Sequence, residues 1–89
     1  MKLEEIKIGL RTAPYEVSVE VLTKYIAEHP EDDEALTCRG MKHWGAGKRS
    51  LALNDYLAAI EINPDSRARE ALRAATEILD YRNKDLYNP

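Results

Sequence analysis

The stretch that decides the fold runs from residue 33 to residue 66 and reads DEALTCRGMKHWGAGKRSLALNDYLAAIEINPDS. Groups of chain breakers bound and divide it: His29-Pro30, Gly45-Ala46-Gly47 and Asn63-Pro64. The segments between them, 31–46 and 49–62, have the length of helices rather than of strands. The second segment also carries large apolar residues at the spacing of one helical face: Leu53, Tyr56, Leu57 and Ile60. We therefore expect a pair of helices joined by a tight turn.

A further helix is expected after Pro64. The apolar residues of segment 65–81 share one side of a helix: Ala68, Ala71, Leu72, Ala75, Ile78 and Leu79. Charged residues occupy most of the remaining surface, which is typical of a helix with one buried face. This pattern favours a helix that closes one end of the fold.

The residues before position 30 fit two interpretations. Apolar and polar residues alternate between 5 and 22, which would suit a β-hairpin turning at Ala13-Pro14. Residues 15–28 also carry a helical stripe: Tyr15, Val19, Leu22 and Ile26. An isolated hairpin is marginal in water and no third strand is available, so we expect a helix over 15–28. The conformation of residues 1–12 stays open at this point.

The two prolines Pro30 and Pro64 lie 34 residues apart, and a 34-residue period of paired helices is a signature of helical solenoids. When residue 33 is taken as the first position, six of eight signature positions match the tetratricopeptide repeat: Leu36, Gly40, Ala52, Tyr56, Ala59 and Pro64. The stretch therefore resembles a repeat of the tetratricopeptide repeat (TPR) family. Arg39 stands where the family usually has leucine, and His43 where it has tyrosine.

The resemblance implies an all-α fold in which antiparallel helical hairpins stack as a short TPR-like solenoid of four to five helices. One domain would cover residues 1–89, with 1–30 as a degenerate first repeat and 31–64 as the full helix pair. Residues 65–81 would form the capping helix that such stacks require, and 82–89 a tail.

The family also implies a function, since its members are typically scaffolds that bind a peptide or a partner helix in a concave groove. The positions that would line this groove are Glu34, Thr37, Met41 and Trp44 on the first helix of the pair and Arg73 and Glu77 on the capping helix. Met41 and Trp44 lie three residues apart and would share a helical face, although Trp44 could instead pack under the N-terminal helix. A short stack has open ends, so a self-associating homodimer without a separate groove is the alternative.

Composition and motifs bear on other functions. The net charge of −3 disfavours a general nucleic-acid binder, and no apolar run reaches the length of a membrane span. We expect no catalytic centre, no metal and no cofactor, because no nucleophile with a base and no metal-ligand spacing stands out. Cys38 is the lone cysteine and is expected to be packed and inert. With no secretory signal at the start, we expect a reducing cytoplasm.

Overall fold

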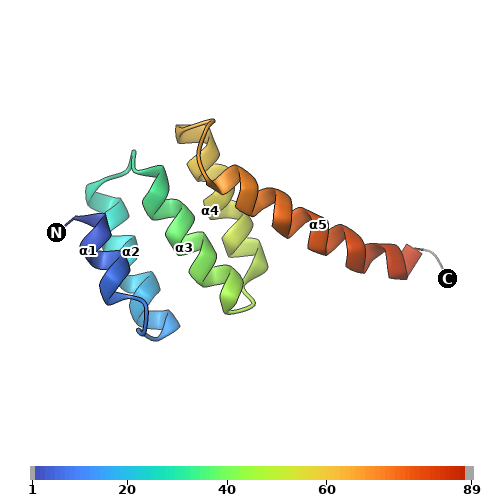
Figure 1. Ribbon diagram of the computed structural model, residues 1–89, viewed down its shortest axis with the longest axis horizontal. Helices are drawn as coiled ribbons and strands as arrows, with labels where there is room; N and C mark the ends of the chain where they lie inside the picture. The colour runs from blue at the N-terminus through green and yellow to red at the C-terminus, as the bar shows by residue number, and fades with distance from the viewer. Residues whose placement is uncertain (1, 88–89) are drawn as a thin grey trace.

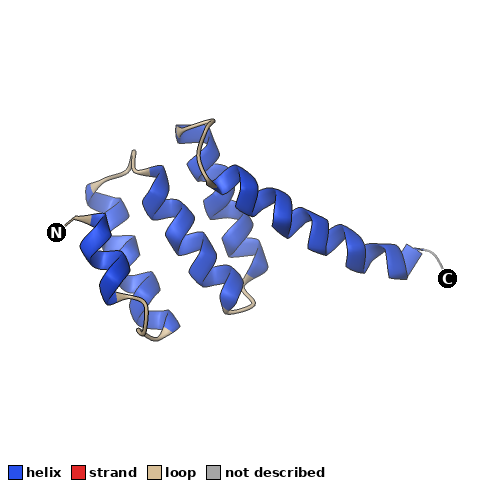
Figure 2. Cartoon of the chain, viewed as in Figure 1, coloured by secondary structure: helices blue, strands red, loops and turns tan. Residues whose placement is uncertain are grey.

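The computed structural model describes residues 2–87, with side chains up to residue 79, and this part of the chain contains helices and no strand. The helices of the described residues are α1 (Leu3–Gly9), α2 (Tyr15–Glu28), α3 (Asp33–Gly45), α4 (Arg49–Ile62) and α5 (Ala68–Tyr87) (Figures 1 and 2). The all-α expectation is confirmed, and α1 and α2 replace the alternative of an N-terminal β-hairpin.

The closest helix pair is α3–α4, and its geometry explains the small residues in the sequence. A Cβ atom added to Gly40 would lie 2.6 Å from Cε1 of the Tyr56 ring and 3.2 Å from Cβ of Asp55. Ala52 and Ala59 on α4 are fully buried, and Tyr56 is 3% exposed. Gly40 therefore lets α4 approach α3, and Tyr56 fills the space between the two helices.

Local features of the chain set the limits of this pair. The carboxylate of Asp32 caps α3 by accepting a hydrogen bond from the backbone N–H of Ala35 at 3.3 Å, and two more acidic residues lie in the first turn. A short turn follows α3, and Gly47 within it has a φ of 79°, a left-handed conformation that favours glycine.

The N-terminal helices pack on one side of α3. Leu3, Ile6 and Leu10 form a buried cluster with Leu22 of α2 and Ala35 of α3. Two polar contacts add to this packing, because Lys7 donates to Glu34 at 3.1 Å and Lys42 donates to the backbone oxygen of Leu10 at 3.1 Å. The seven-residue α1 is therefore anchored by tertiary contacts.

On the other side, α5 begins against α3 and α4 and then leaves them. Ala68, at the start of α5, joins a second buried cluster with Leu36, Tyr56 and Ala59. The backbone N–H of Ala68 is capped by the hydroxyl of Ser66 at 3.1 Å. The helix then runs away from the other four and continues to Tyr87, beyond the end predicted at residue 81 (Figure 1). This projection gives the molecule its elongated dimensions of 51 × 29 × 17 Å.

Candidate interaction site

Two of the predicted groove residues on α3, Thr37 and Glu34, make contacts within the molecule. Thr37 is 1% exposed, and its hydroxyl donates to the backbone oxygen of Asp33 at 2.8 Å. The prediction that Thr37 lines an open groove is therefore wrong. Its hydroxyl has a hydrogen-bond partner within its own helix, so the side chain can be buried. Glu34 is half-buried between two cations, with Lys7 at 3.1 Å and Arg67 at 3.8 Å.

Met41 and Trp44, which were predicted to line the groove together, lie in two different environments. Met41 is 44% exposed and lines a hollow of about 360 Å³ together with Tyr15 and Lys42. Trp44 is half-buried and packs against the second core cluster, on the side of α4. The guanidinium of Arg49 lies 4.9 Å from the centre of the Trp44 ring, within the range of a cation–π contact.

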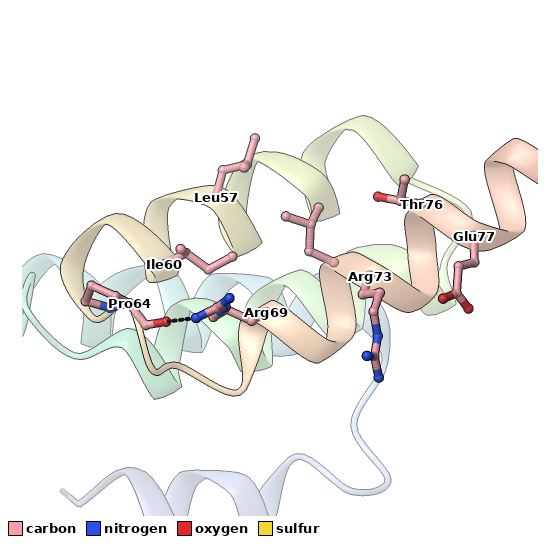
Figure 3. A pocket seen from close by; sticks show the side chains of 8 residues that line it. Leu57, Ile60, Pro64, Arg69, Arg73, Thr76 and Glu77 are labelled. Carbon is pink, nitrogen blue, oxygen red and sulfur yellow. Dashed lines mark hydrogen bonds between the residues drawn. The ribbon is translucent and has the colours of Figure 1, made fainter.

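Arg73 and Glu77, the predicted groove residues on α5, lie at a different place. They line a hollow of about 510 Å³ between α4 and α5, and the structure does not bring Met41 or Trp44 to it. Figure 3 shows this hollow from close by. We call it the α4–α5 groove, and its lining residues are Leu57, Ile60, Pro64, Arg69, Leu72, Arg73, Thr76 and Glu77.

The α4–α5 groove combines an apolar floor with a charged rim. Leu57 is 54% exposed, and Ile60 lies one turn further along α4. Arg69 donates to the backbone oxygen of Pro64 at 3.2 Å, a contact that joins the start of α5 to the end of α4 (Figure 3). Arg73 and Glu77 extend from the side of α5 that faces away from α4 and form the outer rim (Figure 3).

A buried polar cluster connects α2, α3 and α4. Arg39 makes a bidentate pair with Asp55, with its Nε and Nη2 atoms 2.8 and 2.7 Å from the two carboxylate oxygens. His43 lies on the other side of Asp55, with 3.6 Å between Nε2 and Oδ2. The hydroxyl of Tyr15 on α2 is 2.8 Å from Nδ1 of His43, and Thr23 accepts from Arg39 at 3.2 Å.

The environment of His43 favours its neutral form. Burial lowers the pKa of the imidazole, and the nearby Arg39 lowers it further, although Asp55 acts in the opposite direction. A neutral ring that carries its proton on Nε2, facing Asp55, leaves Nδ1 free to accept from the Tyr15 hydroxyl. The side chains of His43 and Asp55 are each only 8% exposed, so this cluster joins helices and offers little surface to a substrate.

Cys38 and the other titratable groups among the described residues do not add a site. Cys38 is half-buried, and burial raises the pKa of its thiol, which keeps the sulfur in its less reactive protonated form. Among the described residues, no group of three or more His, Cys, Asp or Glu side chains could hold a metal ion. A search of the same residues finds no helix with the length and apolar character needed to cross a membrane.

Sequence reasoning missed both main features of the site. The spacing places Leu57 and Ile60 on an apolar helical face, which predicts that they are buried. In the structure they line the hollow between α4 and α5. Arg39 and His43 were noticed as departures from the family pattern, yet their shared partner Asp55 was not. The spacing offered a signal, because residues 39 and 43 share a helical face and a buried cation requires a nearby anion.

No family model matches the chain, and comparisons with curated proteins and with solved structures found no match either. The resemblance to the TPR family therefore rests on residues 33–66 alone and remains a hypothesis.

Proposed function

We propose that this chain is a non-catalytic protein-interaction module that binds a helical or extended segment of a partner protein in the α4–α5 groove. The observation that carries the proposal is the exposure of Leu57 on the floor of a 510 Å³ hollow with charged side chains at its rim. An apolar groove with a polar rim is the usual receptor for an amphipathic helix. The resemblance of residues 33–66 to the TPR family supports the same class of function.

This proposal moves the binding surface from the predicted α3 face to the junction of α4 and α5. Arg73 and Glu77 keep their predicted role, as rim residues. Glu34 and Trp44 serve internal packing, and Met41 lies in the hollow beside Tyr15. The chain has a single cysteine and therefore cannot form a disulfide within itself, and we place the protein in a reducing cytoplasm as part of the proposal.

The test is a selection of displayed peptides on the purified protein, followed by binding measurements with two variants. Leu57→Asp changes the groove floor, and Leu51→Asp is the matched control, because Leu51 lies on the same helix, is 47% exposed and does not line the groove. We expect selected peptides to bind Leu57→Asp at least about tenfold more weakly and Leu51→Asp almost normally. Peptides that bind both variants equally, or a selection that yields none, would contradict the proposal.

A further inference from the structure

His43 joins the start of α2 to α3 from a buried position. Its side chain is 8% exposed, and Nδ1 lies 2.8 Å from the hydroxyl of Tyr15, the first residue of α2. The two rings also meet edge to face, with 5.7 Å between their centres. Histidine is the side chain whose charge ordinarily changes between about pH 5 and about pH 8, so a small change in pH can act on this contact.

Among the described residues, Asp55 and Arg39 are the charged groups that act on the His43 ring. Asp55 of α4 has an oxygen 3.6 Å from Nε2, but Arg39 of α3 already binds both of its carboxylate oxygens, at 2.7 and 2.8 Å. Tyr15 of α2 brings a hydroxyl and no counter-charge to the other nitrogen. A proton on His43 would therefore place a second cation beside a single carboxylate, where little water can hydrate it. Burial lowers the pKa of His43 and Arg39 lowers it further, although Asp55 raises it.

Protonation also changes the hydrogen bond between the two helices. Nδ1 of the neutral ring accepts from the Tyr15 hydroxyl, whereas both nitrogens of the charged ring are donors. The hydroxyl then has to accept, and its own hydrogen needs a new acceptor. Tyr15 is half-buried and lines the hollow of about 360 Å³ beside Met41, so solvent that enters this hollow can supply that acceptor. An outward movement of the start of α2 lets the same solvent hydrate the charged ring.

We propose that the Tyr15–His43 contact is a pH-sensitive switch: the neutral ring holds the start of α2 on α3, and protonation in mild acid releases it. The end of α2 keeps its own link to α3, because Tyr25 donates to Asp32 at 2.9 Å. The opening is therefore local to the start of α2 and the loop before it. It does not depend on the proposed binding function, because neither Tyr15 nor His43 lines the α4–α5 groove.

The sign of the pH effect follows from the direction of the pKa shift. An opened or unfolded chain takes up the proton near the ordinary pKa of histidine, about 6.5, whereas the closed chain takes it up only at a lower pH. Between these two values the opened state binds more protons than the closed one. The contact is therefore fully stabilising above about pH 6.5 and loses its stabilising effect as the pH falls below that value.

The first test is amide hydrogen exchange of the wild-type chain at about pH 7.5 and about pH 5.5, measured by NMR and corrected for the intrinsic exchange rates. The amides of residues 18–22 report on the start of α2, since the N–H of Ser18 is bonded to the oxygen of Pro14. We expect their protection to fall about threefold or more at the lower pH, while residues 56–62 of α4 keep theirs. Unchanged protection at 18–22, or an equal loss in α4, would overturn the proposal.

Two variants assign the effect to one of the two histidines of the chain. His43→Gln keeps an acceptor for the Tyr15 hydroxyl but takes up no proton in this range, so exchange at residues 18–22 should no longer depend on pH. His29→Gln is the matched control, because His29 is exposed and lies at the other end of α2, and it should keep the wild-type change. Each variant is compared with itself at two pH values, so a uniform loss of stability does not affect the result. A His43→Gln chain with the wild-type pH dependence would contradict the switch.

An NMR titration of the His43 ring in the wild-type chain tests the same point without a variant. We expect its midpoint below about pH 6.5, with the ring signals of Tyr15 changing at the same midpoint. A midpoint at or above that value would mean that the closed site accepts the proton without cost, and the proposal would fall.

Discussion

The two helix pairs of this chain bury corresponding positions but use different side chains to do so. In α3–α4, Ala52 is fully buried and Tyr56 is 3% exposed. Thirty-four residues earlier, on α2, Ser18 and Leu22 are also fully buried. The second pair has a glycine and two alanines at its contact, which allow close approach, whereas the first pair has a seven-residue helix held by longer side chains. A pattern of burial can therefore persist where a pattern of residue types does not.

The ion pair between α3 and α4 is more buried than the ion pair that ties α1 to α3. The Arg39–Asp55 pair in α3–α4 is bidentate, and the side chain of Asp55 is 8% exposed. The Lys7–Glu34 pair, which ties α1 to α3, has a single short contact between side chains that are 27% and 33% exposed. The contrast predicts that the α3–α4 pair depends strongly on its ion pair, whereas the docking of α1 on α3 depends little on the Lys7–Glu34 pair.

The largest effect is expected for Arg39→Leu. This substitution removes the charge but leaves Asp55 buried without its cation, which costs about 3 kcal/mol of the free energy of unfolding. Lys7→Leu, the matched change at the contact of α1 with α3, should cost less than about 1 kcal/mol because its partner Glu34 is reached by water. Urea denaturation followed by circular dichroism measures both.

A second variant distinguishes a lost charge pair from poor packing. Arg39→Leu combined with Asp55→Leu removes both charges, and we expect it to recover most of the stability lost in the single variant. If the double variant is less stable than the single one, the loss comes from packing and not from the unpaired carboxylate.

The next effect concerns the close approach of α3 and α4 at Gly40. A methyl group there would lie 2.6 and 2.9 Å from two ring carbons of Tyr56, and we expect Gly40→Ala to destabilise the fold by about 2 kcal/mol. Gly9→Ala is the control at the end of α1, where an added Cβ meets nothing within 4 Å and stability should change little. Relief of the loss by Tyr56→Leu in the same chain would confirm the clash; a Gly40→Ala chain as stable as wild type would refute it.

The smallest effect is expected at the corresponding buried positions Ser18 on α2 and Ala52 on α4. Among the described residues, the buried hydroxyl of Ser18 has no hydrogen-bond partner. Ser18→Ala should therefore raise the free energy of unfolding by about 1 kcal/mol, because it removes an unsatisfied polar group and adds helix propensity. The reciprocal change Ala52→Ser should lower it by a similar amount. Loss of stability in Ser18→Ala would mean that its hydroxyl is satisfied after all.

The helices and their turns could be predicted from the sequence, because chain breakers and the short-range spacing of apolar residues determine them. The contact between Gly40 and Tyr56 was predictable for the same reason, since a glycine inside a helix has a cost that close packing offsets. The α4–α5 groove was not predictable, because the direction of α5 depends on packing between residues distant in the chain. Thr37 was misplaced because its position in the family pattern carries no information about the hydrogen bond to Asp33 that allows its burial.

The short turn at residues 46–48 has a consequence for how the molecule assembles. Closing a loop of so few residues costs little entropy, and contacts close in sequence form fast. The α3–α4 hairpin, with Gly47 already suited to the turn, is therefore the part of the chain that can form first. Helices α1 and α5 obtain a surface to dock on only after that step. They are also the segments expected to open locally, and to exchange their amide hydrogens, while the hairpin stays closed.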